Sequence, residues 1–190
     1  MNSFKTDDKG FTGLEAAIVL IAFVVVAAVF SYVVLGAGFF TTQKAQETVY
    51  KGVEQSTTNI QMIGNVYGLS SDTAAGIDQI RFTIGLAPGA PSINLEKMNI
   101  IVSTPSYGPK TLVWVNASPT ADTNFLTLLN GQGSTSSSTM EAGQQMEIRF
   151  NVTAVPKDTK INIEMRPGVG AALPFTKTTP PAITANNVLY

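Results

Sequence analysis

Residues 11–40 read FTGLEAAIVLIAFVVVAAVFSYVVLGAGFF, and this stretch decides the fold. From Ala16 to Phe40 there are 25 residues without a charge, and fifteen of them are Ile, Val, Leu or Phe. A helix of that length spans about 38 Å, against a bilayer hydrocarbon core of about 30 Å. The fifteen large apolar residues favour insertion into lipid by about 5–9 kcal/mol. Because lipid requires an internally bonded backbone, the stretch predicts an α-helix that can cross a membrane.

Two simpler interpretations of this stretch are weighed against its flanks. A secretory signal peptide has an apolar region of about 7–15 residues that ends at a small-residue cleavage site, so this run is too long for one. A plain single-pass membrane anchor fits the length and stays open at this point.

The composition excludes several kinds of chemistry. The chain has no cysteine, which excludes disulfides, thiolate catalysis and cysteine metal sites, and no histidine, which removes the usual general base and the commonest metal ligand. Twelve basic residues against thirteen acidic ones leave no charge excess for nucleic acid. Charged residues make up 13% of the chain, against about 25% in typical domains. This low charge is typical of a membrane-inserted or self-associating protein, and we expect neither an enzyme nor a cofactor.

A polar segment, residues 1–10, precedes the apolar stretch and ends in Lys9-Gly10. A cut between Gly10 and Phe11 would leave the whole apolar stretch in the product. Glu15 then lies four residues from the new amino terminus, and positions i and i+4 share a helix face. A carboxylate at the edge of an apolar bundle is expensive unless it is paired, and the new α-amine of Phe11, on the same chain or a neighbour, is the cation nearby. A compatible interpretation is that Glu15 simply favours the helix dipole in the first turn.

These flanks carry a family resemblance. Lys9-Gly10-Phe11 with Glu15 and a following Ala/Ile/Val/Leu helix resembles the class III signal peptide of the type IV pilin superfamily. The run GFTGLEAAIVLIAFVV, residues 10–25, is similar nearly residue for residue to archaeal flagellins (archaellins), and the strong match covers about residues 9–65.

The resemblance implies a route to a filament. A membrane enzyme like prepilin peptidase would cut between Gly10 and Phe11, and the helix would stay in the cytoplasmic membrane until an ATP-driven assembly platform extracts it. Subunits would then stack helix-inward, with Phe11 and Glu15 at the assembly contacts, into an extracellular filament that a motor can rotate.

The helix is expected to continue to residue 67. All ten prolines lie at Pro88 or later, so nothing before them forces a break. After Phe40 a stripe recurs at a mean step of about 3.7 residues, the pattern of an amphipathic helix; it consists of Ala45, Val49, Val53, Ser56, Ile60, Ile63 and Tyr67. We therefore divide the chain into a removed leader (1–10), a helix that forms the filament core (11–67) and a head on the outer filament surface (68–190).

The head is predicted to be a β-sandwich. Period-2 alternation appears in several short segments, and Pro- and Gly-containing turns separate many of them; the segments are 80–84, 98–102, 112–115, 146–152 and 161–165. Short alternating strands at this spacing are typical of an antiparallel, Ig-like β-sandwich. The predicted fold class is α+β, with a long N-terminal α-helix followed by that head.

The head offers no residues that we assign to catalysis, cofactor binding or metal binding. Its eight acidic residues match eight Lys/Arg, so it is formally neutral. Glu147 and Glu164 alternate with apolar neighbours, which predicts that they face solvent. The Gly/Ser/Thr-rich residues 131–139 predict a flexible exposed loop, and the chain has no histidine to activate its serines as nucleophiles.

Two N-glycosylation sequons lie in the head, Asn116-Ala117-Ser118 and Asn151-Val152-Thr153. Pro119 follows the first and is expected to reduce its use. Asn151 alternates with apolar neighbours, which predicts an outward side chain and makes it the preferred site. A neutral head packed densely on a filament benefits from hydrophilic N-glycans, because near-zero net charge promotes association.

The leading hypothesis is a structural subunit of the archaeal swimming filament, the archaellum. An archaeal adhesive type IV-like pilin, with the same processing and a head for attachment, is the alternative. A membrane-anchored binding protein that never polymerises is the third hypothesis. It would keep residues 1–10 and carry a ligand pocket in its head.

Overall fold

The computed structural model describes residues 8–129 and 136–190, with side chains described from residue 13 onward. Its first element is α1 (Asp8–Thr57), a single helix of 50 residues, about 75 Å long. No proline interrupts it, and threonine hydroxyls inside it donate to the carbonyl four residues earlier, as Thr41 does to Ala37 at 2.8 Å. At its end, the Thr58 hydroxyl and N–H both donate to the Glu54 carbonyl, at 2.7 and 2.9 Å.

The helix ends ten residues before the predicted end at 67, because residues Ile60–Leu69 form strand β1 instead. Gly64 has φ +76, and the register of β1 against its neighbour shifts between Ile63 and Tyr67. The bulge adds two residues to β1 and so keeps the alternation of faces: the even-numbered Ile60 and Val66 are buried, while the odd-numbered Ile63 and Tyr67 face outward. Ile60, Ile63 and Tyr67 are spaced like one face of a helix but lie on both faces of this strand, which is why the stripe misled the prediction.

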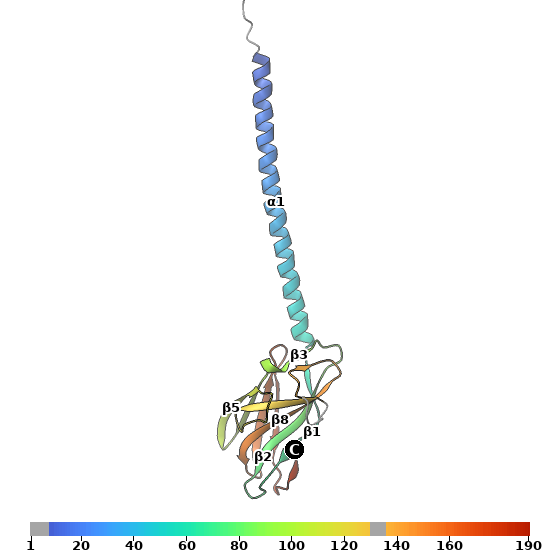
Figure 1. The fold of residues 1–190 in the computed structure, drawn as a ribbon, viewed down its shortest axis with the longest axis vertical. Helices are drawn as coiled ribbons and strands as arrows, with labels where there is room; N and C mark the ends of the chain where they lie inside the picture. Colours follow the sequence, from blue (N-terminus) through green and yellow to red (C-terminus); the bar gives the residue numbers. More distant parts are fainter. Residues whose placement is uncertain (1–7, 130–135) are drawn as a thin grey trace, which may run out of the picture. The chain divides into compact units, whose positions relative to one another are not determined.

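Residues after β1 form a domain that is rich in antiparallel strands (Figure 1). Its other elements are β2 (Ile77–Leu86), β3 (Ile93–Asn94), the short 3-10 helix η1 (Leu95–Lys97), β4 (Asn99–Thr104), β5 (Tyr107–Trp114), β6 (Asn124–Leu129), β7 (Thr139–Met140), β8 (Gln145–Val155), β9 (Lys160–Arg166), β10 (Leu173–Thr178) and β11 (Asn186–Leu189). The predicted strands at 80–84, 112–115, 146–152 and 161–165 correspond to β2, β5, β8 and β9.

Nine strands form one continuous sheet in the order β10-β9-β4-β5-β6-β8-β2-β1-β11, and β3 pairs with β7 in a small second sheet. The β5–β6 pair is parallel, and the other pairs in the described chain are antiparallel. The outer strands β10 and β11 meet at residues 178 and 190, so the sheet curls back on itself. The prediction of a long N-terminal helix followed by an antiparallel β head is thus confirmed. The main strands form one curled sheet, whereas a β-sandwich consists of two sheets that pack face to face.

The core lies inside the curled sheet, where alternate residues of each strand point inward. In β8, Met146, Ile148, Phe150 and Val152 are all buried. The Phe82 ring packs edge-to-face against Phe150 and Phe175, with centroids 6.3 and 5.3 Å apart. This core fixes which face of each strand is left for solvent, and it therefore fixes where the polar candidate residues lie.

Candidate functional site

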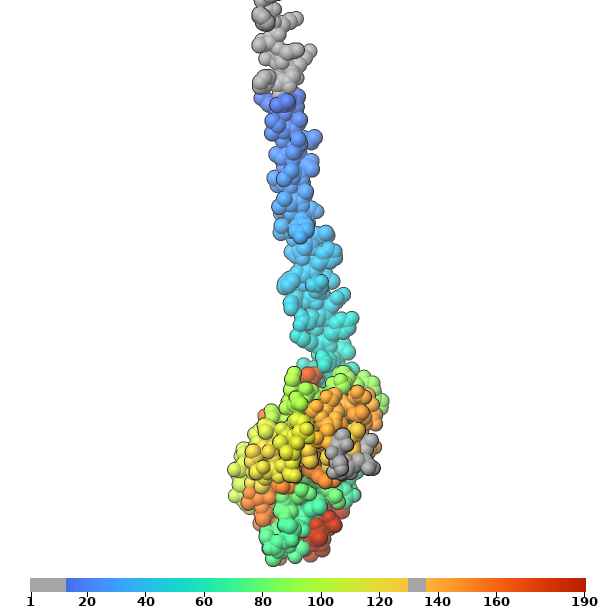
Figure 2. Space-filling view, viewed as in Figure 1, coloured from blue at the N-terminus to red at the C-terminus, as the bar shows by residue number. Residues whose placement is uncertain are grey.

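The most distinctive surface of the chain is the apolar surface of α1 between residues 16 and 40, which runs all round the helix. Every residue from 13 to 57 is exposed in the single chain, including Leu20 (67% exposed) and Phe23 (71% exposed). Figure 2 shows these side chains as a continuous surface along the helix. The helix is long and apolar enough to cross a membrane, by length and composition. A surface of this extent cannot stay in water, so it requires either lipid or other apolar helices around it.

Charge is confined to the ends of this surface. The sequence has no Asp, Glu, Lys or Arg from residue 16 to residue 43, and Glu15 stands at the start of that interval. Glu15 is exposed on α1 and is free to meet a group on another molecule. Lys9, Gly10 and Phe11 lie in the helical backbone, but their side chains are outside the described residues. The predicted cleavage bond therefore stays a prediction.

The β-domain has a broad hollow of about 620 Å³ on the outer face of β11, β1, β2 and β8. Asn186, Leu69, Gln79 and Asn151 are cross-strand neighbours that form its floor. Its acid, Asp78, accepts hydrogen bonds from the Ser71 N–H (2.9 Å) and hydroxyl. Within residues 8–129 and 136–190, no group of three or more acidic residues gathers to hold a metal ion. The hollow thus combines apolar side chains with one carboxylate, amides and hydroxyls, several of which are bonded to one another.

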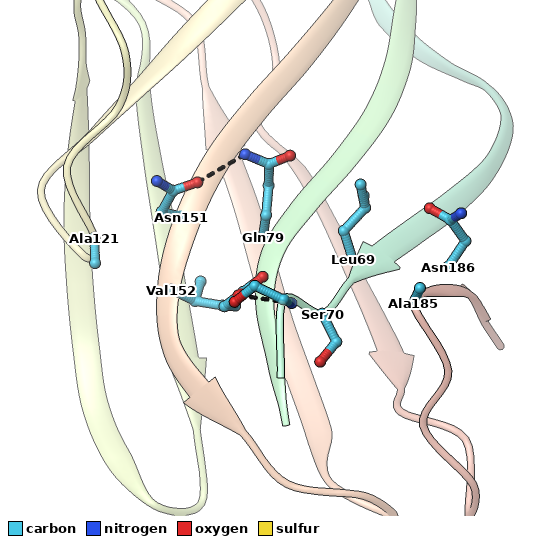
Figure 3. A pocket seen from close by; sticks show the side chains of 10 residues that line it. Leu69, Ser70, Gln79, Ala121, Asn151, Val152, Ala185 and Asn186 are labelled. Atoms are coloured by element: carbon cyan, nitrogen blue, oxygen red, sulfur yellow. Dashed lines mark hydrogen bonds between the residues drawn. The ribbon is translucent and has the colours of Figure 1, made fainter. Parts of the chain in front are cut away.

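The two sequons differ in their surroundings. Asn116 lies in the loop between β5 and β6, residues 115–123 (hereafter the 115–123 loop), and is exposed, with its Oδ1 accepting from the Ser136 hydroxyl. Asn151 lies on β8 and points away from the core, as predicted, but it is half-buried. Its Oδ1 accepts from Gln79 Nε2 at 2.9 Å, and its Nδ2 donates to the Pro119 carbonyl at 2.8 Å. Figure 3 shows Asn151 between Gln79 and the loop that carries Ala121.

The two predicted outward acids form ion pairs along their own strands. Glu147 pairs with Arg149, and Glu164 accepts from Arg166 Nε and Nη2 at 2.8 and 3.0 Å. The hydrogen bonds from Arg166 hold the pKa of the Glu164 carboxyl below its ordinary value. Both pairs are only partly covered from solvent and join residues of one strand, so they contribute little to stability, and they have no geometry for catalysis.

Sequence reasoning missed two residues that the fold brings together. Tyr107, at the start of β5, has a buried hydroxyl without a hydrogen-bond partner among the described residues. Its burial, followed by the negative charge of Asp122, raises its pKa to about 12. Asp122 has φ +57, in the left-handed region that Asp tolerates better than most residues. The local sequence does not reveal the burial of Tyr107 or its proximity to Asp122, because both depend on how the strands pair.

Comparison with known proteins gives a consistent family. The family model described as archaeal-type flagellin matches residues 10–177. Probable flagellin 1 of Archaeoglobus fulgidus is 41% identical over 199 residues, and the alignment covers 98% of this chain and 97% of the relative.

Two solved structures are similar to the whole chain or to most of it. The archaeal flagellum of Methanospirillum hungatei strain JF1 matches with a TM-score of 0.73 and 32% identity, covering 94% of this chain and 99% of that chain. Flagellin FlaB1 from Methanocaldococcus jannaschii matches with a TM-score of 0.59 over 70% of this chain and 96% of that chain; at 18% identity it supports the fold alone. The helix, the antiparallel head and the family match agree with the resemblance at the amino terminus, and the chain belongs to the archaeal-type flagellin family.

Proposed function

We propose that this chain is a structural subunit of an archaeal swimming filament and that it polymerises through α1. The observation that carries the proposal is the fully exposed apolar surface of α1, in a chain similar over 94% of its length to the archaeal flagellum of Methanospirillum hungatei. Each large apolar side chain that leaves water contributes about 1.5–3 kcal/mol. Packing α1 against the same helix of other copies removes this surface from water without a lipid bilayer.

The amino terminus would supply both processing and pairing. Cleavage between Gly10 and Phe11 by an enzyme like prepilin peptidase removes the polar leader and creates an α-amine at Phe11. That amine is the cation available to Glu15 in the helical core, because no Lys or Arg follows until Lys44. An unpaired carboxylate in such a core is expensive, so pairing favours one axial register between neighbouring helices.

The precursor and the assembled subunit would occupy different environments. Before assembly, α1 lies in the cytoplasmic membrane, which its length and composition allow. Assembly moves it into the extracellular filament, and extraction from lipid requires an energy-driven assembly platform. The β-domain, with its core of buried residues and its polar exterior, then forms the outer filament surface.

Mass mapping of the amino terminus in sheared surface filaments tests the proposal. We expect the protein to begin at Phe11 and to be the main component of the filaments. A protein that begins at Met1 and remains with the membrane would contradict polymerisation and favour an anchored binding protein. Deleting the gene should abolish swimming. Loss of surface attachment with swimming unchanged would instead identify an adhesive pilin.

A further inference from the structure

The second sequon is built into a contact that holds the 115–123 loop, the loop that carries the first. Asn151 Nδ2 donates to the Pro119 carbonyl at 2.8 Å, and the Asp122 N–H donates to the Asn151 carbonyl at 3.0 Å. Thr153, the third residue of the sequon, donates its N–H to Asp122 Oδ1 at 3.1 Å and its hydroxyl to Asp122 Oδ2. We call this set of bonds among Asn151, Thr153, Pro119 and Asp122 the loop clasp.

In the loop clasp, the two side-chain groups that a glycosylation sequon requires both donate hydrogen bonds. The acceptor atom for a glycan is the asparagine Nδ2, and the sequon also requires the hydroxyl two residues later. In the second sequon, Nδ2 and the Thr153 hydroxyl both point into the 115–123 loop. Asn151 is also held from its other side, where its Oδ1 accepts from Gln79 Nε2.

The first sequon is more open than the second, in which Thr153 is exposed but Asn151 is half-buried and Val152 is buried. Asn116, Ala117 and Ser118 are all exposed, in irregular backbone after β5. The Asn116 Oδ1 accepts from the Ser136 hydroxyl, while its Nδ2 has no hydrogen bond among the described residues. A glycan is bulky and belongs on an exposed loop, so the fold leaves this asparagine open.

We infer that the folded head accepts an N-glycan at Asn116 and that Asn151-Val152-Thr153 serves as a loop clasp and carries no glycan. In the transfer, Asn116 Nδ2 attacks the first sugar carbon of a lipid-linked oligosaccharide. The Nδ2–carbon bond forms, the sugar–phosphate bond breaks, and one amide proton is lost as the lipid phosphate leaves. This inference rests on the proposed export of the head to the cell surface and does not depend on polymerisation. It reverses the order that the sequence alone favours.

Glycopeptide mass mapping of the protein from cell-surface material tests the inference. In the natural protein we expect glycan on the peptide with Asn116 and none on the peptide with Asn151. Glycan on Asn151, or an unmodified Asn116, overturns it. The same digest reports the amino terminus, so a failure of the proposed processing is seen separately.

A pair of matched variants tests whether the clasp is the cause. Asp122→Gly keeps the left-handed backbone and the Asn151-Val152-Thr153 sequon, but removes both acceptors for Thr153. We expect glycan to become detectable on Asn151 in this variant. Asp158→Gly is the control, because Asp158 has φ +54 in an exposed turn outside the clasp, and it should leave Asn151 unmodified.

A third variant covers the case in which Asp122→Gly fails to fold. Thr153→Ser retains both the sequon and a hydroxyl that can donate to Asp122, so Asn151 should stay unmodified. Glycan on Asn151 in Thr153→Ser, or no change at Asn151 in a folded Asp122→Gly protein, shows that the clasp does not control acceptor choice.

Discussion

Thr178 and Tyr190 join the two outer strands of the nine-stranded sheet. The Thr178 N–H donates to the Tyr190 carbonyl at 2.7 Å, and the Tyr190 N–H donates back to the Thr178 carbonyl at 3.3 Å. These two bonds occupy backbone groups that would otherwise remain unpaired at the edges of β10 and β11. Unpaired edges template association with other chains, so the closure also limits where neighbouring copies can pair through strands.

Removing the donor at Thr178 should destabilise the β-domain. Thr178→Pro loses the 2.7 Å bond to Tyr190 and weakens its partner, so we expect a loss of about 1–3 kcal/mol in the free energy of unfolding. Thr176→Pro is the control: its N–H lies on the same side of β10, two residues before the bonded pair, where β11 does not extend. Denaturant unfolding of the full-length protein in detergent micelles measures both, and equal losses would contradict a closed sheet.

Tyr107 should make the β-domain sensitive to alkaline pH. Its folded pKa of about 12 lies above the ordinary tyrosine pKa of about 10, so between these pH values the folded state holds a proton that the unfolded state has lost. Stability should therefore be complete below about pH 10 and fall as the pH rises toward 12. Tyr107→Phe should remove this part of the decline. Near neutral pH it should be neutral or stabilising, by up to about 1 kcal/mol, because the buried hydroxyl has no partner among the described residues.

Thermal unfolding of the natural and Tyr107→Phe proteins at pH 8 and pH 11 checks this. Tyr190→Phe serves as the control, since that ring is 63% exposed. An identical pH 8-to-11 decline in the natural and Tyr107→Phe proteins would show that other groups cause it.

Gly170 should tolerate alanine much less well than Gly143. Both glycines have positive φ, +106 and +80, so alanine is strained at each by about 1–2 kcal/mol. A Cβ at Gly170 would also collide with the carbonyl oxygen of Thr58, the residue that follows α1, whereas a Cβ at Gly143 meets nothing within 4 Å. We expect Gly170→Ala to cost clearly more than Gly143→Ala in chemical denaturation. Equal costs would mean that backbone strain alone governs both positions.

Glu15→Gln should impair filament assembly without preventing processing. The change keeps the side-chain size but removes the charge that we propose to pair with the α-amine of Phe11. An uncompensated charge at such a position costs about 2.5–3.5 kcal/mol. We expect cleaved subunits to accumulate in the membrane fraction and few filaments to appear by electron microscopy. Glu96→Gln makes the same charge change at an exposed position of the head and should assemble normally; normal filaments from Glu15→Gln would refute the pairing.

The sequence predicted the parts of the fold that depend on local pattern. The charge-free run after Glu15 requires a helix, and the alternation in Met146–Val152 identifies a strand, because both signals are periodic and strong. It failed at β1, because Ile63 and Tyr67 are apolar on the outer face while Gly64 and Gly68 take two of the even-numbered positions, so the sequence shows no clear alternation. It also missed β10, which contains Pro174, and β11, which has four residues, since both are weak signals that become strands through their neighbours.

In the candidate site, too, local motifs were predicted from the sequence, whereas contacts between distant residues were not. Glu15 and the sequons are readable as motifs, and the outward direction of Asn151 follows from alternation. The bonds from Asn151 to Pro119 and from Thr153 to Asp122 join residues 32 and 31 positions apart. Only the register of β8 against its neighbours brings these residues together, so no local sequence pattern predicts the bonds between them.

The position of β1 also determines how the subunit resists mechanical force. The chain passes from α1 through Thr58 and Asn59 directly into β1, which is hydrogen-bonded to β2 on one side and β11 on the other. Tension drawn along the helix therefore enters the head through an interior strand. To remove the whole strand, the ladder to β2 (Ile60–Leu69) and the ladder to β11 (Val66–Leu69) must both break, whereas an edge strand has a single ladder to lose. A filament that transmits torque gains from anchoring each head by a strand that is paired on both sides.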